Sequence, residues 1–577
     1  MKTKILLSAM AAAGLCLTSC ESMDLVPKME GNTESWYTTE TELNLASNDF
    51  YILGYWNQPL ESSEQWTDNT TYRQQNRNPN SNGTVLDGTL NGQQYEVYAL
   101  WQQSYKLIAR CNTMLENIHK AEGNVAESVI NRYKGEAYFC RACKYADLTF
   151  FYGDVPYMDR TMTIDEAEKM GRRNKDEVKE LTYADFDKAI EYLPESYGTN
   201  EEIHATKGAA MAMKARYALY MHDYDIAEAA AKQCIDLGIY SLYASYADLF
   251  KQQTKNVPEK IFCLPRLAST DVFLDEWFVK NGLPRNAGGY GSYNPSWDLL
   301  ASYLCTDGLP IDESPLFDPR NPFENRDPRC TMTIVEFNTR HCGFEYDPSP
   351  AAKEVMNYNT GKMQTNKDSR INTDGQYASY NGLLWKKGID DSWVENHEVE
   401  QDYVIIRYAD VLLIYAEALI EQNKDLDVAA DCINQVRARA YGVDKGETDA
   451  YPAVVATDQA QMRKAVRIER RMEFAMENQR LQDLMRWDLA IKALNGYNYI
   501  MLLDANKELT DVVNTGNWFW GITPQIDEDG LADFAPLYNR GLCAYGAKRV
   551  FPERQMLWPI PTHDTQLNPN LGNNPGY

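Results

Sequence analysis

The sequence predicts a mostly α fold in which pairs of helices support a second half made of long loops and short strands. Apolar residues recur at the spacing of an α-helix in several separated blocks. Between these blocks the chain is rich in glycine, proline, asparagine, aspartate and aromatic residues, and long periodic runs are few. Its 577 residues, 44% of them hydrophobic, are enough for one large domain or two closely packed domains.

Two segments of the chain have the pattern of paired helices. Residues 209–235 and 412–436 each contain two apolar stretches at helical spacing, separated by polar turns at 222–225 and 422–427. A helix, a short turn and a second helix with small residues at the crossing are typical of a tetratricopeptide-like unit. The match is to the hydrophobic spacing and not to the full repeat signature. Further helices are expected at about 95–119, 125–151, 176–192 and 466–490.

The helical and loop-rich parts alternate along the chain. The helical scaffold is expected at about 95–237 and 405–490, and the loop-rich half at about 54–92, 239–400 and 495–551. Ordered loops of this length usually carry function. We therefore expect the ligand site in the loop-rich half.

The first twenty residues have the features of an export signal. Lys2 and Lys4 precede a short apolar run at 5–17, which is too short to span a bilayer. The run ends in Leu17-Thr18-Ser19-Cys20, which resembles a bacterial lipobox. This resemblance implies that residues 1–19 are removed as a signal peptide and that Cys20 is lipidated, so that the chain is tethered to a membrane.

Composition narrows the class of partner. The 83 acidic residues outnumber the 57 basic ones and give a formal net charge of −26, which argues against nucleic acid as a partner. Tyrosines (38) outnumber phenylalanines (17) more than twofold, and there are 12 tryptophans. Tyrosine and tryptophan combine an apolar face with a polar tip and suit half-wet surfaces.

Neither the cysteines nor the histidines predict a metal or catalytic site. Cys140 and Cys143 form a C-x-x-C pair without a second pair or a nearby histidine, and we interpret them as core residues. Cys330 and Cys342 could form a disulfide, which sequence alone leaves open. The six histidines are isolated, and neither G-x-S-x-G nor a phosphate-binding loop is present. The acidic run at 527–530 is interpreted as a turn and not as a calcium site. No metal, no cofactor and no catalytic residue is therefore predicted from the sequence.

A basic cluster lies at the start of the expected helix 466–490. It could be an anion site, but acidic residues follow at i,i+3 spacing, which favours ion pairs along the helix. The expected pairs are Arg470 with Glu473, Glu477 with Arg480, Arg480 with Asp483, and Asp483 with Arg486.

Six stretches, spread from residue 110 to the last residue, resemble the SusD/RagB family. Each is weak alone, but all occur in the family's order. They contain Arg110-Cys111-Asn112, Gly135-Glu136-Ala137-Tyr138-Phe139, Asn325-Arg326-Asp327-Pro328-Arg329, Arg407-Tyr408-Ala409-Asp410-Val411-Leu412, Ile468-Glu469-Arg470-Arg471-Met472-Glu473 and Trp558-Pro559-Ile560-Pro561.

This resemblance implies a single SusD-like domain over 20–577 with a right-handed superhelix of tetratricopeptide-like helix pairs. It implies a non-catalytic lipoprotein on the outer surface of the outer membrane. Such a protein closes over a SusC-like TonB-dependent transporter, which its helical half faces, and its loops bind a nutrient, commonly a glycan. A peptide-binding member of the same family is the first alternative, since helical repeats also bind peptides. A glycoside hydrolase is the second, because its two carboxylates leave no sequence signature.

Candidate ligand residues follow from the chemistry of a sugar ring, which offers apolar C–H patches fringed by hydroxyls. A matching surface needs exposed aromatic rings beside polar side chains. We predict that Trp66, Tyr72, Trp277 and Tyr290 form an aromatic platform, and that Asp68, Asn69 and Arg73 contact hydroxyls. Trp393 is a further possibility. None of these residues lies in a motif that carries the family resemblance.

Overall fold

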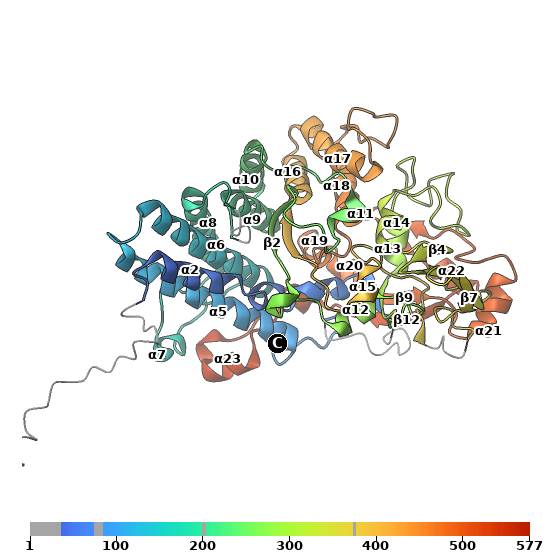
Figure 1. The fold of residues 1–577 in the computed structure, drawn as a ribbon, viewed down its shortest axis with the longest axis horizontal. Coiled ribbons are helices and arrows are strands. Elements are labelled where there is room, and N and C mark those ends of the chain that lie inside the picture. The colour runs from blue at the N-terminus through green and yellow to red at the C-terminus, as the bar shows by residue number, and fades with distance from the viewer. Residues whose placement is uncertain (1–35, 74–84, 199–203, 373–376) are drawn as a thin grey trace, which may run out of the picture.

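A computed structural model describes residues 36–73, 85–198, 204–372 and 377–577, so Cys20 and the expected signal peptide lie outside the described residues. The helical half is a row of antiparallel helices that pack on their neighbours, running from α5 to α17 (Figure 1). Its members are α5 (Tyr95–Asn117), α6 (Glu127–Tyr152), α8 (Lys175–Tyr192), α9 (Lys207–Tyr220), α10 (Tyr224–Asp236), α16 (Tyr408–Glu421) and α17 (Leu426–Tyr441).

Both predicted helix pairs are confirmed, and their ends have local causes. The Thr206 side chain caps α9 by accepting the Ala209 N–H. The polar turn between α9 and α10 contains His222 with a positive φ, and α17 ends at Gly442, also with a positive φ. The four helices α9, α10, α16 and α17 pack in succession, as helix pairs in a repeat array do.

The expected long helix at 466–490 is wrong. α18 (Gln459–Phe474) stops, residues 475–479 turn with positive φ at Met476 and Asn478, and the short α19 (Arg480–Arg486) and α20 (Ala490–Ala493) follow. The buried carboxylate of Glu64 accepts the N–H groups of Met476 (3.1 Å) and Asn478 (3.0 Å). Because these donors are satisfied from a distant segment, the helix can break here without leaving them unpaired.

The loop-rich half contains small antiparallel sheets, as predicted. β1 (Thr70–Tyr72) pairs with β3 (Tyr293–Pro295), and β2 (Lys260–Leu264) with β8 (Tyr403–Arg407). β4 (Thr339–His341), β5 (Phe344–Tyr346), β6 (Glu354–Asn357) and β7 (Lys362–Thr365) form a four-stranded sheet. β9 (Gly496–Ile500) pairs with β12 (Ala544–Arg549), and β10 (Gln525–Ile526) with β11 (Ala532–Asp533). The turn between β10 and β11 holds the acidic run, where the Asp527 carboxylate accepts the N–H groups of Asp529 and Leu531.

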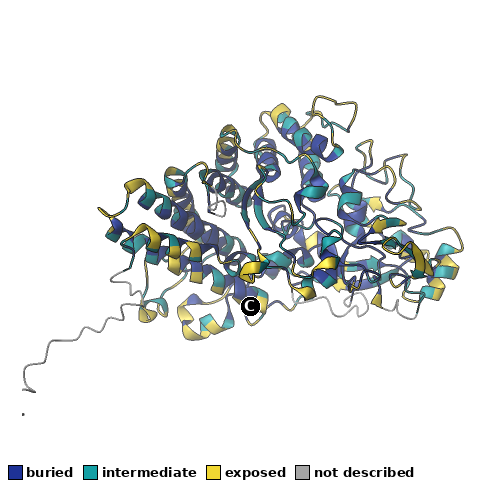
Figure 2. Cartoon of the chain, in the orientation of Figure 1, coloured by how far each residue is buried: buried dark blue, intermediate teal, exposed yellow. Residues whose placement is uncertain are grey.

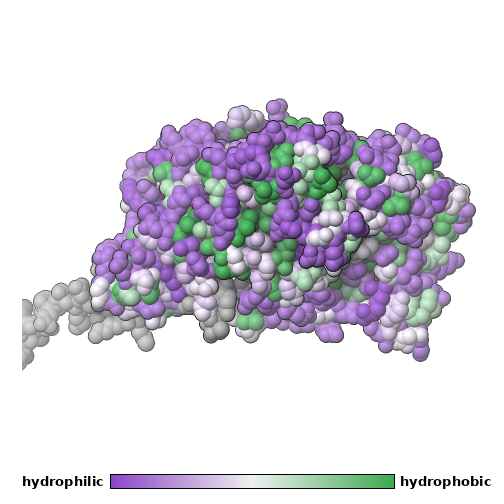
Figure 3. Space-filling model, turned by 90° about the horizontal axis from the view of Figure 1, so that it is seen from above, coloured by the Kyte–Doolittle hydropathy of each residue, from purple (hydrophilic) through white to green (hydrophobic). Residues whose placement is uncertain are grey.

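Three large hydrophobic cores fill the molecule, and buried residues line the inner faces of the helices (Figure 2). The first core contains Cys140 and Cys143, which confirms their interpretation as packing residues. Cys330 and Cys342 are buried free thiols and form no disulfide in the structure. The face seen from above is largely hydrophilic, with hydrophobic groups scattered between polar ones (Figure 3). Across the described ranges, every helix is too short or too polar to cross a bilayer.

The C-terminal segment returns to the N-terminal part of the chain. The Trp558 N–H donates to the Phe151 carbonyl at 2.6 Å, and its ring packs on that of Trp66 with centroids 5.6 Å apart. The Asn574 amide donates to the Tyr152 carbonyl at 2.9 Å. The third core is therefore completed by residues from both ends of the described chain.

Candidate functional site

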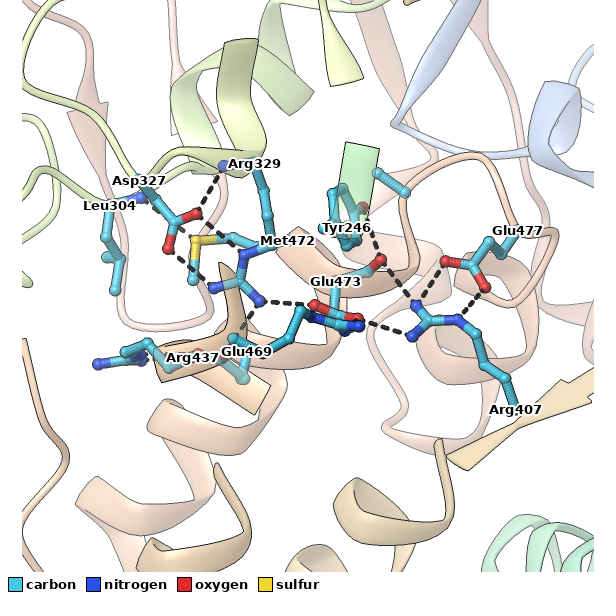
Figure 4. Close-up of polar contacts among 12 residues, drawn as sticks. Tyr246, Leu304, Asp327, Arg329, Arg407, Arg437, Glu469, Met472, Glu473 and Glu477 are labelled. Atoms are coloured by element: carbon cyan, nitrogen blue, oxygen red, sulfur yellow. Dashed lines mark hydrogen bonds and ion pairs between the residues drawn. The ribbon is translucent and has the colours of Figure 1, made fainter. Parts of the chain in front are cut away.

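Glu469 and Glu473 of α18 lie in a buried ion-pair network with arginines from other elements (Figure 4). The buried arginines of the basic cluster, Arg470 and Arg471, pair with Asp410 and Asp68, so these two charges do not form an anion site. Glu473, fully buried, accepts from Arg329 at 2.9 Å and from Arg407 at 2.7 Å, and also from Arg439. Burial alone would raise the pKa of Glu473, but these guanidinium groups hold it well below its usual range. The network joins α18 to α17, to the end of β8 and to α14 (Arg329–Thr333).

Three of the four expected ion pairs along this segment are wrong, and only Asp483 with Arg486 forms, at 2.8 Å. Arg470 pairs instead with Asp410 at 2.8 Å and with Asp483 at 3.0 Å. Glu477 pairs with Arg407 and Lys387, and Arg480 pairs with Asp68. Most partners are thus distant in sequence, and the charges are structural.

Trp66, Asp68 and Asn69 do not face solvent, so the expectation that they are exposed is wrong. The Trp66 side chain is 7% exposed and packs against Trp558 in the third core. The Asn69 amide donates to Glu64 at 2.8 Å, and its oxygen accepts from Arg471 at 3.1 Å. Neither an exposed ring nor a free polar group remains here for a ligand. Trp393 is likewise buried, in the second core.

The carboxylate of Asp68 balances the positive charges of two buried arginines. Its carboxylate lies 2.8 Å from the Arg471 guanidinium and 2.9 Å from that of Arg480. Burial by itself would raise the pKa of Asp68, but Arg471 and Arg480 lower it below the usual range. Burial and the neighbouring Arg480 lower the pKa of Arg471 to about 10. These charges hold the first loop against α18 and α19.

Trp277 and Tyr290 are exposed, as their predicted role requires. Trp277 is 61% exposed on α12 (Glu276–Gly282), and Tyr290 is 39% exposed on the loop that follows. The Tyr290 N–H donates to the Lys280 carbonyl at 2.6 Å, which fixes this loop on α12. Tyr377, 44% exposed, lies nearby because Arg73 donates to the carbonyl groups of both Tyr290 and Tyr377. We call Trp277, Tyr290 and Tyr377 the aromatic platform.

Two arginines and a tyrosine contact residues of the aromatic platform and of the helix that carries Trp277. The guanidinium groups of Arg73 and Arg285 lie 5.7 Å and 5.5 Å from the centre of the Tyr377 ring. The Tyr72 hydroxyl donates to the Asn281 side chain at 3.4 Å. Arg73 is itself buried, so its place is behind the aromatic rings and not among groups free to contact a ligand.

The loop between α12 and β3 is held by a buried carboxylate. Asp368 accepts the backbone N–H groups of Arg285 at 2.8 Å and Asn286 at 3.1 Å. Burial raises the pKa of Asp368 to about 6, and the two N–H donors oppose this rise. Arg285 and Tyr290 are thus presented from a loop whose backbone is fixed at several points.

Sequence reasoning missed Tyr377, because it lies almost ninety residues beyond Tyr290 and in no recognisable motif. The long-range hydrogen bonds of Arg73 bring it beside Tyr290. Within the described ranges, no group of three or more His, Cys, Asp or Glu side chains could hold a metal ion.

Residues 258–577 match the family model described as "SusD family", and residues 26–219 match one described as "Starch-binding associating with outer membrane". The SusD-like protein P2 of Formosa agariphila is 25% identical over 525 residues, 86% of this chain and 93% of that protein. A SusD-like protein of Bacteroides ovatus is 24% identical over 534 residues, 86% and 85% of the two chains.

Solved structures agree with these matches. A SusD-like carbohydrate-binding protein of Bacteroides fragilis is 26% identical, with a TM-score of 0.74 over 93% of this chain and 99% of that one. A laminarin-binding SusD-like protein is 19% identical, with a TM-score of 0.61 over 94% of this chain and all of the other. The latter likeness concerns the fold. With a family model that covers more than half of its length, this mostly helical chain belongs to the SusD family, as its motifs predicted.

Proposed function

We propose that this chain captures a glycan at the cell surface and delivers it to a SusC-like TonB-dependent transporter. Residues 20–577 form a single SusD-like domain in this proposal, and the glycan binds at the aromatic platform. Members of the SusD family are binding proteins and not enzymes, in agreement with the non-catalytic role predicted from the sequence.

The observation that carries this proposal is the exposure of Trp277 on α12, the helix to which the exposed Tyr290 is hydrogen-bonded. The buried tryptophans such as Trp66 and Trp393 pack in cores, whereas the Trp277 ring is largely free in solvent. An exposed indole on a fixed support offers a flat apolar face for the C–H groups of a pyranose ring. The carbohydrate-binding relative of known structure supports the same ligand class.

The Trp277→Ala variant is expected to lose glycan affinity by about 1–3 kcal/mol, because a stacking aromatic at the centre of a site is a binding hot spot. Binding of the chain from Glu21 onward would be measured by calorimetry against a panel of polysaccharides, with peptides alongside. Tyr98→Ala is the matched control, since Tyr98 is also an exposed aromatic residue but lies on α5 in the helical half. Unchanged glycan binding by Trp277→Ala would move the site elsewhere, and peptide binding without glycan binding would favour the peptide-importing alternative.

The lipid anchor at Cys20 and the transporter are parts of the same proposal. We expect Cys20→Ala to abolish incorporation of a labelled fatty acid and to release the chain from the outer-membrane fraction, because the acyl acceptor is lost. Ser19→Ala keeps a small residue before the cysteine and should behave as the unchanged chain. Equal labelling of both variants would refute lipidation at this residue. Co-purification of the unchanged chain with a TonB-dependent transporter would test the partner, and its absence would count against it.

A further inference from the structure

A groove in the helical half is lined mainly by apolar side chains. Three helices line it, α5, α7 (Ile164–Ala167) and α23 (Thr562–Leu567), which lie together at the lower left of Figure 1. Tyr98, Trp101 and Tyr105 contribute aromatic rings from one face of α5, because they are spaced three and four residues apart. The groove has a volume of about 790 Å³. We call it the apolar groove.

The apolar groove has the properties of a docking surface. Ile164 of α7 is 78% exposed, and Leu567 at the end of α23 is 56% exposed. Single exposed apolar side chains are common, but apolar side chains that gather in one groove mark an interaction site. The Tyr105 hydroxyl is already engaged, since it donates to the Pro156 carbonyl at 2.8 Å. The groove therefore suits an apolar occupant better than a sugar, which needs hydrogen-bond partners.

The described part of the chain begins beside one end of this groove. Trp36 packs against the first core, to which Tyr37 belongs. Burial and the neighbouring Asp49 raise the pKa of the Tyr37 hydroxyl, and the nearby Arg110 guanidinium opposes this rise. Arg110 directly follows Ala109, the last residue of α5 that lines the groove. The segment that precedes Trp36 therefore starts near the Ala109 end of the apolar groove.

Residues 23–30 lie outside the described residues, but their sequence alternates as in an amphipathic extended segment. Every second residue is apolar, namely Met23, Leu25, Pro27 and Met29, and the residues between and after them are Asp24, Val26, Lys28 and Glu30. In an extended chain successive side chains point to opposite faces, so one face is apolar throughout and the other is charged except at Val26. Pro27 favours the extended conformation at Val26 as well.

The lengths of this segment and of the groove agree. From Met23 to Met29 an extended chain spans about 20 Å. From Tyr98 to Ala109 the helix α5 spans about 17 Å. The residues between Met29 and Trp36 reach up to about 20 Å, which is enough to connect the two. The family match that begins at residue 26 also includes most of this segment, as expected if it is part of the domain.

We propose that the apolar groove binds the chain's own N-terminal segment, residues 23–29, in an extended conformation with the alternating apolar side chains against α5, α7 and α23. Because the segment belongs to the same chain, its effective concentration at the groove is high, which favours it over a separate partner. Cys20, three residues before Met23, then emerges at the Tyr98 end. With the proposed lipidation of Cys20, on which this consequence rests, the anchor is held beside α5 and not on a free tether of fifteen residues.

Trypsin provides the test, because Lys28 is the one lysine or arginine between Glu21 and Ser35. Mass spectrometry of the chain from Glu21 onward follows cleavage after Lys28 as the loss of residues 21–28. The reference is the free peptide 21–35, treated in the same way. We expect the chain to be cut at least about tenfold more slowly than the peptide, since a docked segment must leave the groove before the protease can act.

The main variant changes the groove and leaves the protease site as it is. Ile164→Asp combined with Leu567→Asp places two charges in the apolar groove, so cleavage after Lys28 should become as fast as in the peptide. The matched control is Val455→Asp combined with Leu503→Asp, two apolar residues of similar exposure in other loops, and it should keep the protection. All four side chains are exposed, so both double variants are expected to fold normally.

The two faces of the segment are tested separately. Leu25→Asp should abolish the protection, whereas Val26→Asp, on the opposite face, should leave it unchanged. Each of these variants is compared with a free peptide of its own sequence, so that any effect of the new charge on trypsin itself is removed.

Equal cleavage of the unchanged chain and the peptide would overturn this inference, and so would protection that survives in the variant with Ile164→Asp and Leu567→Asp. Protection that increases with protein concentration would place the segment in the groove of a second copy and would also overturn it. Glycan binding at the aromatic platform and acylation of Cys20 are measured independently, so either can fail without the other.

Discussion

Replacing Glu473 by alanine is expected to lower the free energy of unfolding by about 3–5 kcal/mol, because three buried guanidinium groups would lose their shared carboxylate. Arg329 and Arg407 each donate to Glu473 within 2.9 Å, and Arg439 donates as well. All of these side chains are buried, so water cannot replace the lost acceptor. Chemical denaturation of the purified chain would measure the effect.

The control for Glu473→Ala is an ion pair of the same chemistry on the surface. Lys232 and Asp236 of α10 lie 2.7 Å apart, and both side chains are more than half exposed. Lys232→Ala should change the free energy of unfolding by no more than about 0.5 kcal/mol, since water screens such pairs. If Glu473→Ala destabilised the protein no more than Lys232→Ala does, the network would not have the structural importance that its burial indicates.

Trp66→Ala is expected to lower the free energy of unfolding by about 3–5 kcal/mol without changing the intrinsic affinity for glycan. The indole is almost fully buried against Trp558, and its removal leaves a cavity that the third core cannot fill. Thermal and chemical unfolding would measure the loss, and calorimetry on the folded fraction would measure the affinity.

Trp277→Ala is expected to show the opposite pattern, with nearly unchanged stability and weaker glycan binding. Because Trp277 is largely exposed, its removal should change stability by no more than about 0.5 kcal/mol while it weakens glycan binding. A Trp66→Ala variant of unchanged stability, or one that is stable but fails to bind glycan, would contradict the structural role of Trp66. The two tryptophans therefore separate packing from recognition in one experiment.

The helices could be predicted because their signal is local. The periodic apolar residues of α9, α10, α16 and α17 lie within a few turns of one another, and each turn between them is polar. The break after Phe474 could not be predicted, because the carboxylate of Glu64 that stabilises it is 412 residues from Met476. The same holds for most ion pairs of α18 and α19, for example Asp68 with Arg480.

The candidate site could be predicted only in part, because it too depends on contacts between residues that are distant in sequence. Trp66 and Trp277 each directly follow two polar residues in the sequence, yet one is buried and the other exposed. The difference is made by Trp558, which covers Trp66 from almost five hundred residues away. Local composition identifies loops rich in aromatic residues, but only tertiary packing decides which of their rings remain in contact with water.

The return of the C-terminal segment has a consequence for biogenesis. A polypeptide is synthesised from its N-terminus, and the third core needs Trp558 and Leu571 against Trp66 and Phe151. These early residues therefore stay without their partners until nearly the whole polypeptide has been synthesised. Completion of the third core depends on this last segment, so loss of a short C-terminal stretch would expose aromatic surface near the opposite end of the sequence and leave the chain open to aggregation.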